Sequence, residues 1–109
     1  MFLTSRVVSP KLKEALTKMQ ALNSRLLGTQ RDLAQVQAQL KEITDDQSRL
    51  RANFEKVPPT SAAYKRYLEK FDSQETQIEK LQADIKAKQA TEKAQRKELE
   101  DYVAGLSVE

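Results

Sequence analysis

The sequence predicts an all-α protein that folds as an antiparallel two-helix coiled-coil hairpin with a tight Pro-Pro turn. Nearly a third of the 109 residues are charged, while glycine, proline and aromatic residues are scarce. This composition is typical of long helices and coiled coils. Apolar residues recur in steps of three and four along two long segments, as a helix seam requires. Two adjacent prolines, Pro58 and Pro59, separate these segments near the middle of the chain.

The first helix is predicted over residues 10–56. Ser9 is placed to accept hydrogen bonds from the N–H groups of the first turn. Pro10 follows at the first helical position, where its missing N–H costs nothing. Each of the two helices would contain about 45 residues and measure about 70 Å.

The apolar stripe of this first helix predicts a shift of phase before Leu26, close to Gly28. Two alternatives follow, a bend or break at Gly28 and a continuous helix. We favour the continuous helix because one glycine costs only about 1 kcal/mol and a long packed seam can absorb that cost. The stripe begins with Leu12, Leu16, Met19 and Leu22.

The turn is predicted over residues 57–61, because proline lacks an N–H and disfavours helical geometry in the residue before it. Thr60 or Ser61 can cap the second helix, which is predicted over residues 61–104. Gly105 then acts as the stop signal of the second helix. The whole chain is interpreted as a single hairpin domain.

The two apolar patterns agree on one antiparallel register. In such a pair, the numbers of facing residues have a constant sum, and one sum explains nearly every apolar position. Gln47 faces Gln74 in this register, and two glutamines that bond each other would fix it. The facing apolar pairs are Val57 with Tyr64, Phe54 with Tyr67, Leu50 with Phe71, Ile43 with Ile78, Leu40 with Leu81, Val36 with Ile85, Leu22 with Leu99, and Met19 with Tyr102.

Three layers of the predicted seam carry polar residues on the second helix. This predicts a weak, bent or hydrated section of the hairpin. In the alternative, alanines of the second helix face the seam there and the two helices approach more closely. The layers pair Leu33 with Lys88, Thr29 with Glu92, and Leu26 with Gln95, and the alanines are Ala87, Ala90 and Ala94.

The candidate functional site is a basic cluster at the tip of the hairpin. Six cationic residues lie in a stretch that contains only two acidic residues. Tyr64 and Tyr67 lie among them, so the tip could contact RNA or an acidic protein surface. The alternative is that both tyrosines belong to the seam and that the charges form a solvated face. The cluster comprises Arg49, Arg51, Lys56, Lys65, Arg66 and Lys70.

The composition argues against an enzyme and assigns no catalytic residue, cofactor or metal. The chain contains no histidine and no cysteine, which removes the commonest general base and the main transition-metal ligands. The carboxylates of Glu98, Glu100 and Asp101 are interpreted as surface charge. No apolar run reaches the roughly 18 residues that span a bilayer. We find no signal peptide, and the compartment is not assigned.

Both ends of the chain carry short β-branched segments, which we expect to be extended. They would be frayed tails, or they would continue into a β-rich body that carries the hairpin as an arm. Four further runs are informative, namely residues 5–16, 46–53, 64–71 and 102–106. They resemble the terminal helical region of large bacterial proteins related to the mucoidy-inhibitor-A-like family. The resemblance implies that the chain is a fragment of a larger protein, associated with the cell envelope.

These observations predict a structural arm that spaces, docks or oligomerises a larger bacterial protein. Its partner would be another protein or a second copy, for example in a homodimer that forms a four-helix bundle. The alternative is a nucleic-acid-binding arm that acts through the basic tip, and nucleic acid is the less favoured partner.

Overall fold

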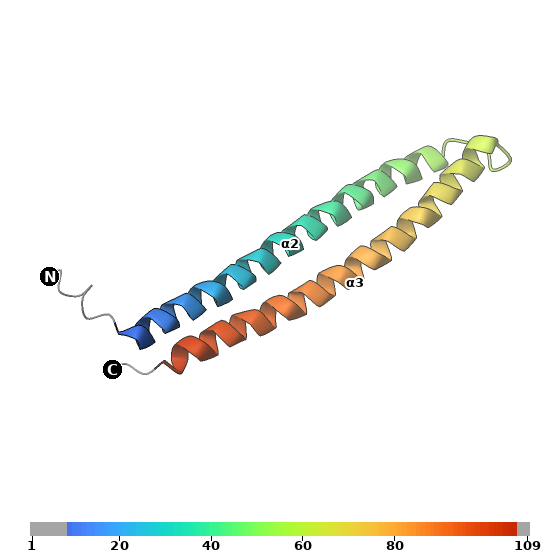
Figure 1. Ribbon diagram of the computed structural model, residues 1–109. Helices are drawn as coiled ribbons and strands as arrows, with labels where there is room; N and C mark the ends of the chain where they lie inside the picture. The colour runs from blue at the N-terminus through green and yellow to red at the C-terminus, as the bar shows by residue number, and fades with distance from the viewer. Residues whose placement is uncertain (1–8, 107–109) are drawn as a thin grey trace. The chain divides into compact units, whose positions relative to one another are not determined.

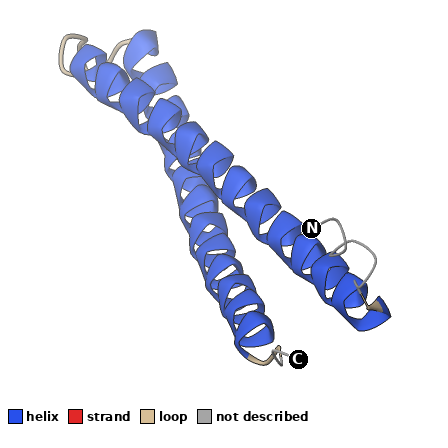
Figure 2. Ribbon diagram, turned by 90° about the vertical axis from the view of Figure 1, so that its left-hand side faces the viewer, coloured by secondary structure: helices blue, strands red, loops and turns tan. Residues whose placement is uncertain are grey.

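The computed structural model describes residues 9–106 and shows two α-helices joined by a loop of residues 55–61 (Figure 1). Helix α2 comprises Pro10–Phe54 and helix α3 comprises Ala62–Ala104. The described part of the chain contains helix and loop but no strand (Figure 2). The contacts between the helices are antiparallel, so the fold is the predicted all-α helical hairpin. The predicted extended segments at the two ends lie outside the described residues.

The chain divides into two compact units, each of which contains part of both helices. Unit 1 comprises Met1–Arg31 and Ala90–Glu109, and unit 2 comprises Asp32–Gln89. The division falls among the layers that were predicted to be polar on the second helix.

The helix ends follow the capping signals of the sequence. Ser9 Oγ accepts a hydrogen bond from the backbone N–H of Leu12 at 3.0 Å. Ser61 Oγ accepts one from the N–H of Tyr64 at 3.1 Å and donates one to the carbonyl of Pro58 at 2.7 Å. Of the two predicted caps for the second helix, Ser61 is therefore the one used.

The bounds differ slightly from those predicted around the turn. Helix α2 ends at Phe54, two residues earlier than expected, and α3 begins at Ala62. The N–H of Lys56 bonds the carbonyl of Asn53 at 3.1 Å, an i to i−3 bond that tightens the chain after the last α-helical turn. The C-terminal end of α3 agrees with the prediction, since this helix stops at Ala104, just before Gly105.

Unit 2 has a seam in the predicted register. Leu50 is its most buried apolar residue at 2% exposure. The ring of Phe54 contacts the rings of Tyr64 and Phe71, with centroids 4.4 and 6.5 Å away. These two rings lie one turn to either side of Tyr67, the residue predicted to face Phe54, as expected for a side chain that inserts between two turns of its partner. The other buried apolar residues of this unit are Leu33, Val36 and Ile78.

Unit 1 corrects the predicted start of the seam. Leu12 and Leu16 are each 47% exposed, whereas Ala15 is buried at 8%. The seam therefore runs through Ala15, and its steps of three and four continue without the predicted shift of phase before Leu26. Helix α2 is also continuous through Gly28, so the favoured alternative is confirmed and the break is not found. The other buried apolar residues of this unit are Leu22 and Leu26.

The three layers in which polar residues of the second helix face the seam are present as predicted. The alternative, in which alanines face the seam instead, is not found. Lys88, Glu92 and Gln95 are half-buried on α3. The ammonium of Lys88 bonds Asp84 at 2.8 Å, and Glu92 pairs with Arg96 at 3.0 Å. Long side chains can thus cover the seam with their stems and keep their charged ends paired on the same helix. The alternative with inward alanines is wrong, because Ala87, Ala90 and Ala94 are exposed.

Candidate functional site

The six cationic residues of the predicted tip cluster are all exposed and all lie in unit 2. They fall into two groups according to their contacts. Arg49, Arg51 and Lys70 contact other side chains of the unit, as described below. Lys56, Lys65 and Arg66 form no ion pair with any described residue.

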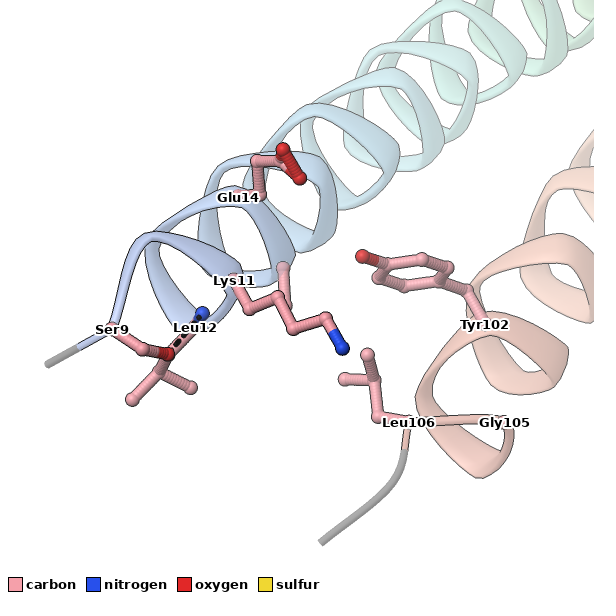
Figure 3. Close-up of a pocket in the computed structure, with 8 residues that line it drawn as sticks. Ser9, Lys11, Leu12, Glu14, Tyr102, Gly105 and Leu106 are labelled. Atoms are coloured by element: carbon pink, nitrogen blue, oxygen red, sulfur yellow. Dashed lines mark hydrogen bonds between the residues drawn. The ribbon is translucent and has the colours of Figure 1, made fainter. Parts of the chain in front are cut away.

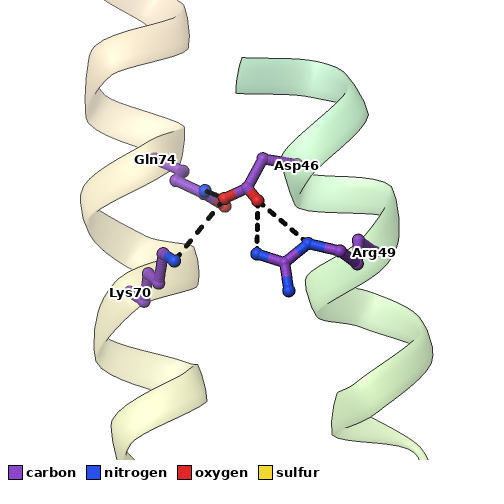
Figure 4. Close-up of polar contacts among 4 residues, drawn as sticks. All are labelled: Asp46, Arg49, Lys70 and Gln74. Atoms are coloured by element: carbon purple, nitrogen blue, oxygen red, sulfur yellow. Dashed lines mark hydrogen bonds and ion pairs between the residues drawn. The ribbon is translucent and has the colours of Figure 1, made fainter. Parts of the chain in front are cut away.

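The carboxylate of Asp46 contacts two of the tip cations and the side-chain amide of Gln74 (Figure 4). Its Oδ1 accepts hydrogen bonds from Arg49 Nη2 at 2.5 Å and Nε at 3.1 Å. Its Oδ2 accepts one from Gln74 Nε2 at 2.6 Å and lies 3.6 Å from Lys70 Nζ. Since Gln74 and Lys70 belong to α3, this carboxylate ties the two helices together, and Arg49 and Lys70 are engaged within the fold.

The same contacts fix the charge of this group. The hydrogen bonds from Arg49 and from Gln74 lower the pKa of Asp46 below its usual value of 3.8, although partial desolvation opposes them. Asp46 in turn raises the pKa of Arg49. The carboxylate is therefore ionised at neutral pH and is suited to hold cations rather than to transfer protons.

The two seam glutamines do not bond each other as predicted. Gln47 and Gln74 are buried at 8% and 6% exposure, in the predicted layer. However, Gln47 Nε2 donates to Glu75 Oε1 at 2.7 Å, while Gln74 donates to Asp46. Each amide prefers a carboxylate one residue away from its predicted partner because a charged acceptor makes the stronger hydrogen bond. The sequence signal for this was present, since each glutamine has an acidic neighbour.

The aromatic residues of the tip belong to the seam. Tyr64 and Tyr67 are half-buried, and Tyr64 packs edge-on against Phe54. The guanidinium of Arg51 lies 5.6 Å from the centroid of the Phe71 ring, within the range of a cation–π contact. The interpretation of the tyrosines as seam residues is therefore confirmed. Beside these rings lies a hollow of about 310 Å³, lined by Arg51, Phe54, Glu55, Leu68 and Phe71.

A second hollow, of about 380 Å³, lies in unit 1 where α2 begins and α3 ends (Figure 3). The side chains of Lys11 and Tyr102 extend into the space between the helices, and Leu106 lies beside them. The Tyr102 ring also contacts the ammonium of Lys18, 4.8 Å from its centroid. Ala15, which is buried in the seam, and Leu106 both line this hollow.

Two of the acidic residues near the end of α3 lie beside cations. Glu98 lies 3.9 Å from Arg25, and Asp101 pairs with Lys97 at 2.8 Å. Asp101 raises the pKa of Lys97 through this hydrogen bond. Within residues 9–106, no three acidic side chains come together in a way that could hold a metal ion. Neither α2 nor α3 includes a stretch that is long and apolar enough to cross a bilayer.

Comparison of the chain with protein-family models, with curated proteins and with solved structures finds no match.

Proposed function

We propose that the chain is a structural coiled-coil arm, used for spacing, protein–protein docking or oligomerisation of a larger bacterial protein. The observation that carries this proposal is a pair of charged hydrogen bonds that cross the seam of unit 2, which we call the clasp. Asp46 and Glu75 each accept a hydrogen bond from a buried glutamine of the opposite helix. A polar contact at a seam position costs stability but specifies register, which is what a part with a mechanical role needs.

The nature of the larger protein is part of the same proposal. The runs that resemble mucoidy-inhibitor-A-like proteins include residues 46–53 and 64–71, which lie on the two helices on either side of the turn. A parent protein of this kind would place the arm beside a β-rich body at the cell envelope. In this proposal, the residues of the arm bind and position, and catalysis belongs to another part of the parent.

A second candidate function is nucleic-acid binding through the tip. The observation that favours it is the group of three exposed cations, Lys56, Lys65 and Arg66, which have no anionic partner among the described residues. Three charges give only a weak electrostatic contact with a phosphate backbone at physiological salt. Base stacking would need open aromatic faces, and Tyr64 is engaged with Phe54.

The arm is tested by measuring the stiffness of α2 with spin labels. Ser24 and Ala52 are both exposed and lie four heptads apart, so labelled cysteines at these sites should be separated by about 42 Å along the helix. The chain has no native cysteine that would compete for the label. A narrow distribution of distances near that value is expected. A broad distribution, or one centred at much shorter distances, would contradict the arm.

The second candidate is tested by titrating a single-stranded RNA of about 20 nucleotides at two salt concentrations. The variant Lys56→Glu/Lys65→Glu/Arg66→Glu removes the three tip cations. The control variant Lys13→Glu/Lys80→Glu/Lys93→Glu makes the same change of charge at exposed sites away from the tip. We expect weak binding that responds equally to both variants. Tight binding that only the tip variant abolishes would make nucleic acid the partner.

A further inference from the structure

Helix α2 carries an exposed face without charge in unit 1, on the segment between Leu16 and Leu27. This neutral face consists of Leu16, Gln20, Asn23 and Leu27, all exposed. At about 100° per residue, the four positions lie within about 60° of the helix circumference. Leu16 and Leu27 are 47% and 49% exposed. Two large apolar side chains therefore stand on one outer face, with two amides between them.

The charges of this segment lie on the other flank of the seam. Lys18 stands over the ring of Tyr102, and Arg25 lies beside Glu98. Both are thereby directed towards α3, about 180–200° around the helix from the neutral face. The seam itself, through Leu22 and Leu26, runs between the two flanks. The neutral face is thus distinct from the hairpin seam and from the charged surface.

The pattern of a helix in a larger bundle differs from that of a helix in a simple pair. A two-helix coiled coil needs apolar residues only at the two seam positions of each heptad. A helix that also packs on a second neighbour has a wider uncharged surface, which includes one flanking position. Leu16 and Asn23 occupy such a flanking position, one residue after Ala15 and Leu22 of the seam.

The neutral face is complementary to itself. Its residues are separated by four, three and four positions, so the order leucine, amide, amide, leucine is the same in both directions. If two copies of the face meet antiparallel about a two-fold axis, Leu16 of each copy opposes Leu27 of the other. Gln20 of each copy then opposes Asn23 of the other, and the paired amides can exchange hydrogen bonds. No like charges meet within the face. Just beyond each of its ends, Lys13 of one copy lies near Arg31 of the other on the exposed outer rim, where solvent screens the repulsion.

We infer that the neutral face binds a second copy of the same chain, with the two α2 helices antiparallel across a two-fold axis. The inference rests on the proposed function, because it names the surface and the partner of the oligomerising arm. The resulting assembly brings four helices together in unit 1, two from each copy. In an assembly with closed two-fold symmetry, the same patch of both copies forms the interface. This face can do so because the order of its residues is the same in both directions.

Charge argues for this occupant over others. The neutral face itself offers no cation to a nucleic acid or an acidic protein and no carboxylate to a basic partner; the nearest cations, Lys13 and Arg31, lie one turn beyond its two ends. A membrane-surface helix needs a wide and continuous apolar face, whereas the amides of Gln20 and Asn23 separate the two leucines of the neutral face. An uncharged surface is matched best by another uncharged surface.

The first test is the mass of the full chain by light scattering over a range of concentrations. We expect a dimer that dissociates on dilution, and we expect Leu16→Lys/Leu27→Lys to raise the dissociation constant at least tenfold. Leu68→Lys/Val103→Lys is the matched control, because it adds the same two charges at exposed apolar positions of α3, where Leu68 is 49% and Val103 43% exposed. A wild-type chain that stays monomeric at about 1 mM, the limit of a useful affinity, would overturn the inference. An association that both lysine variants weaken equally would overturn it too.

The second test reads the orientation by disulfide cross-linking, which the absence of native cysteine makes unambiguous. Chains with Leu16→Cys are mixed with chains with Leu27→Cys and then oxidised. The mixed disulfide is expected to form at least tenfold faster than either homotypic one, because equivalent residues lie about 16 Å apart along antiparallel helices. Cysteines whose Cα atoms are more than about 7 Å apart do not bridge. Faster homotypic cross-linking would contradict the antiparallel pairing.

Failure of this inference and failure of the proposed function give different results. A monomer with a narrow distribution of spin-label distances in α2 overturns the second-copy inference and leaves the arm in place. A broad distribution of distances contradicts the arm, whatever the mass of the particle. Circular dichroism of each variant checks that the helices remain, which we expect because both leucines are about half exposed.

Discussion

Replacing Leu50 with alanine should destabilise the hairpin by about 2–4 kcal/mol. Leu50 is 2% exposed and lies in unit 2 next to the layer of Gln47 and Gln74. The change removes three buried carbons, worth about 0.8 kcal/mol each, and it adds a cost for the space that is left. A seam of two helices can close part of that space, so we do not expect the upper end of the range for leucine in a deep core.

The assay is thermal and urea unfolding followed by circular dichroism at a fixed protein concentration. For a domain of this size, the loss corresponds to a fall of about 10–20 °C in Tm. The fixed concentration matters because any self-association would make the Tm depend on it.

The control is Leu68→Ala, since Leu68 is 49% exposed. This variant should lose less than about 1 kcal/mol because most of the deleted surface already contacts water. Equal losses in the two variants would refute the reasoning, because they would show that Leu50 is not held in a packed seam. A loss below about 0.5 kcal/mol for Leu50→Ala would refute it as well, since that is the range of ordinary surface changes.

Three further predictions concern the helices and their pairing. Gly28→Ala should raise the free energy of unfolding by up to about 1 kcal/mol, since alanine is the better helix former and an added Cβ meets nothing within 4 Å; a clear loss measured by urea unfolding would contradict it. Ser61→Ala should cost about 1 kcal/mol, because the cap of α3 and the bond to Pro58 are both lost, and an unchanged Tm would show that the cap contributes nothing. Arg49 and Gln74 lower the pKa of Asp46 in the folded state. The Asp46 carboxylate therefore stabilises the fold fully above the usual carboxyl pKa of 3.8, and this stabilisation is lost as the pH falls through the lower pKa of the folded state. The difference in Tm between the wild type and Asp46→Asn should therefore shrink in acid below pH 3.8, and a difference that grows there would contradict the role of the carboxylate.

The fold was predictable because its determinants are local and periodic. The caps at Ser9 and Ser61 and the stop at Gly105 depend on residues within one turn, which the sequence shows directly. The register followed from matching two heptad patterns across one turn. This is a strong constraint, because a shift of the pairing would bring apolar residues opposite polar ones along much of the seam.

The start of the seam could not be predicted from hydrophobicity alone. Leu12 and Leu16 are more apolar than Ala15, yet the heptad phase that leads to Met19 and Leu22 passes through Ala15. Which residues are buried depends on the position of α3, which packs against the row of α2 that contains Ala15 and leaves the row that contains Leu16 exposed. The misassigned leucine Leu16 belongs instead to the neutral face, for which we propose a second copy as the partner.

The contacts of the candidate site were also only partly predictable. The sequence identified the basic cluster, but it could not show that Asp46 engages Arg49 and Lys70 and leaves other cations unpaired. That outcome depends on which of several neighbouring acceptors a long side chain reaches, and it is decided by side-chain geometry across the seam. For the same reason, Gln74 selects Asp46 rather than the facing glutamine.

The most direct test of the account is an intramolecular disulfide across the seam. The chain with Ile43→Cys and Ile78→Cys should cross-link readily on oxidation, because the register makes these positions face each other in unit 2 and Ile78 is buried at 8%. The chain with Ile43→Cys and Ile85→Cys, one heptad out of register, should cross-link at least tenfold more slowly, since one heptad adds about 10 Å along the helix. Faster cross-linking of the second chain would contradict the register in which Gln47 and Gln74 reach the carboxylates of the opposite helix.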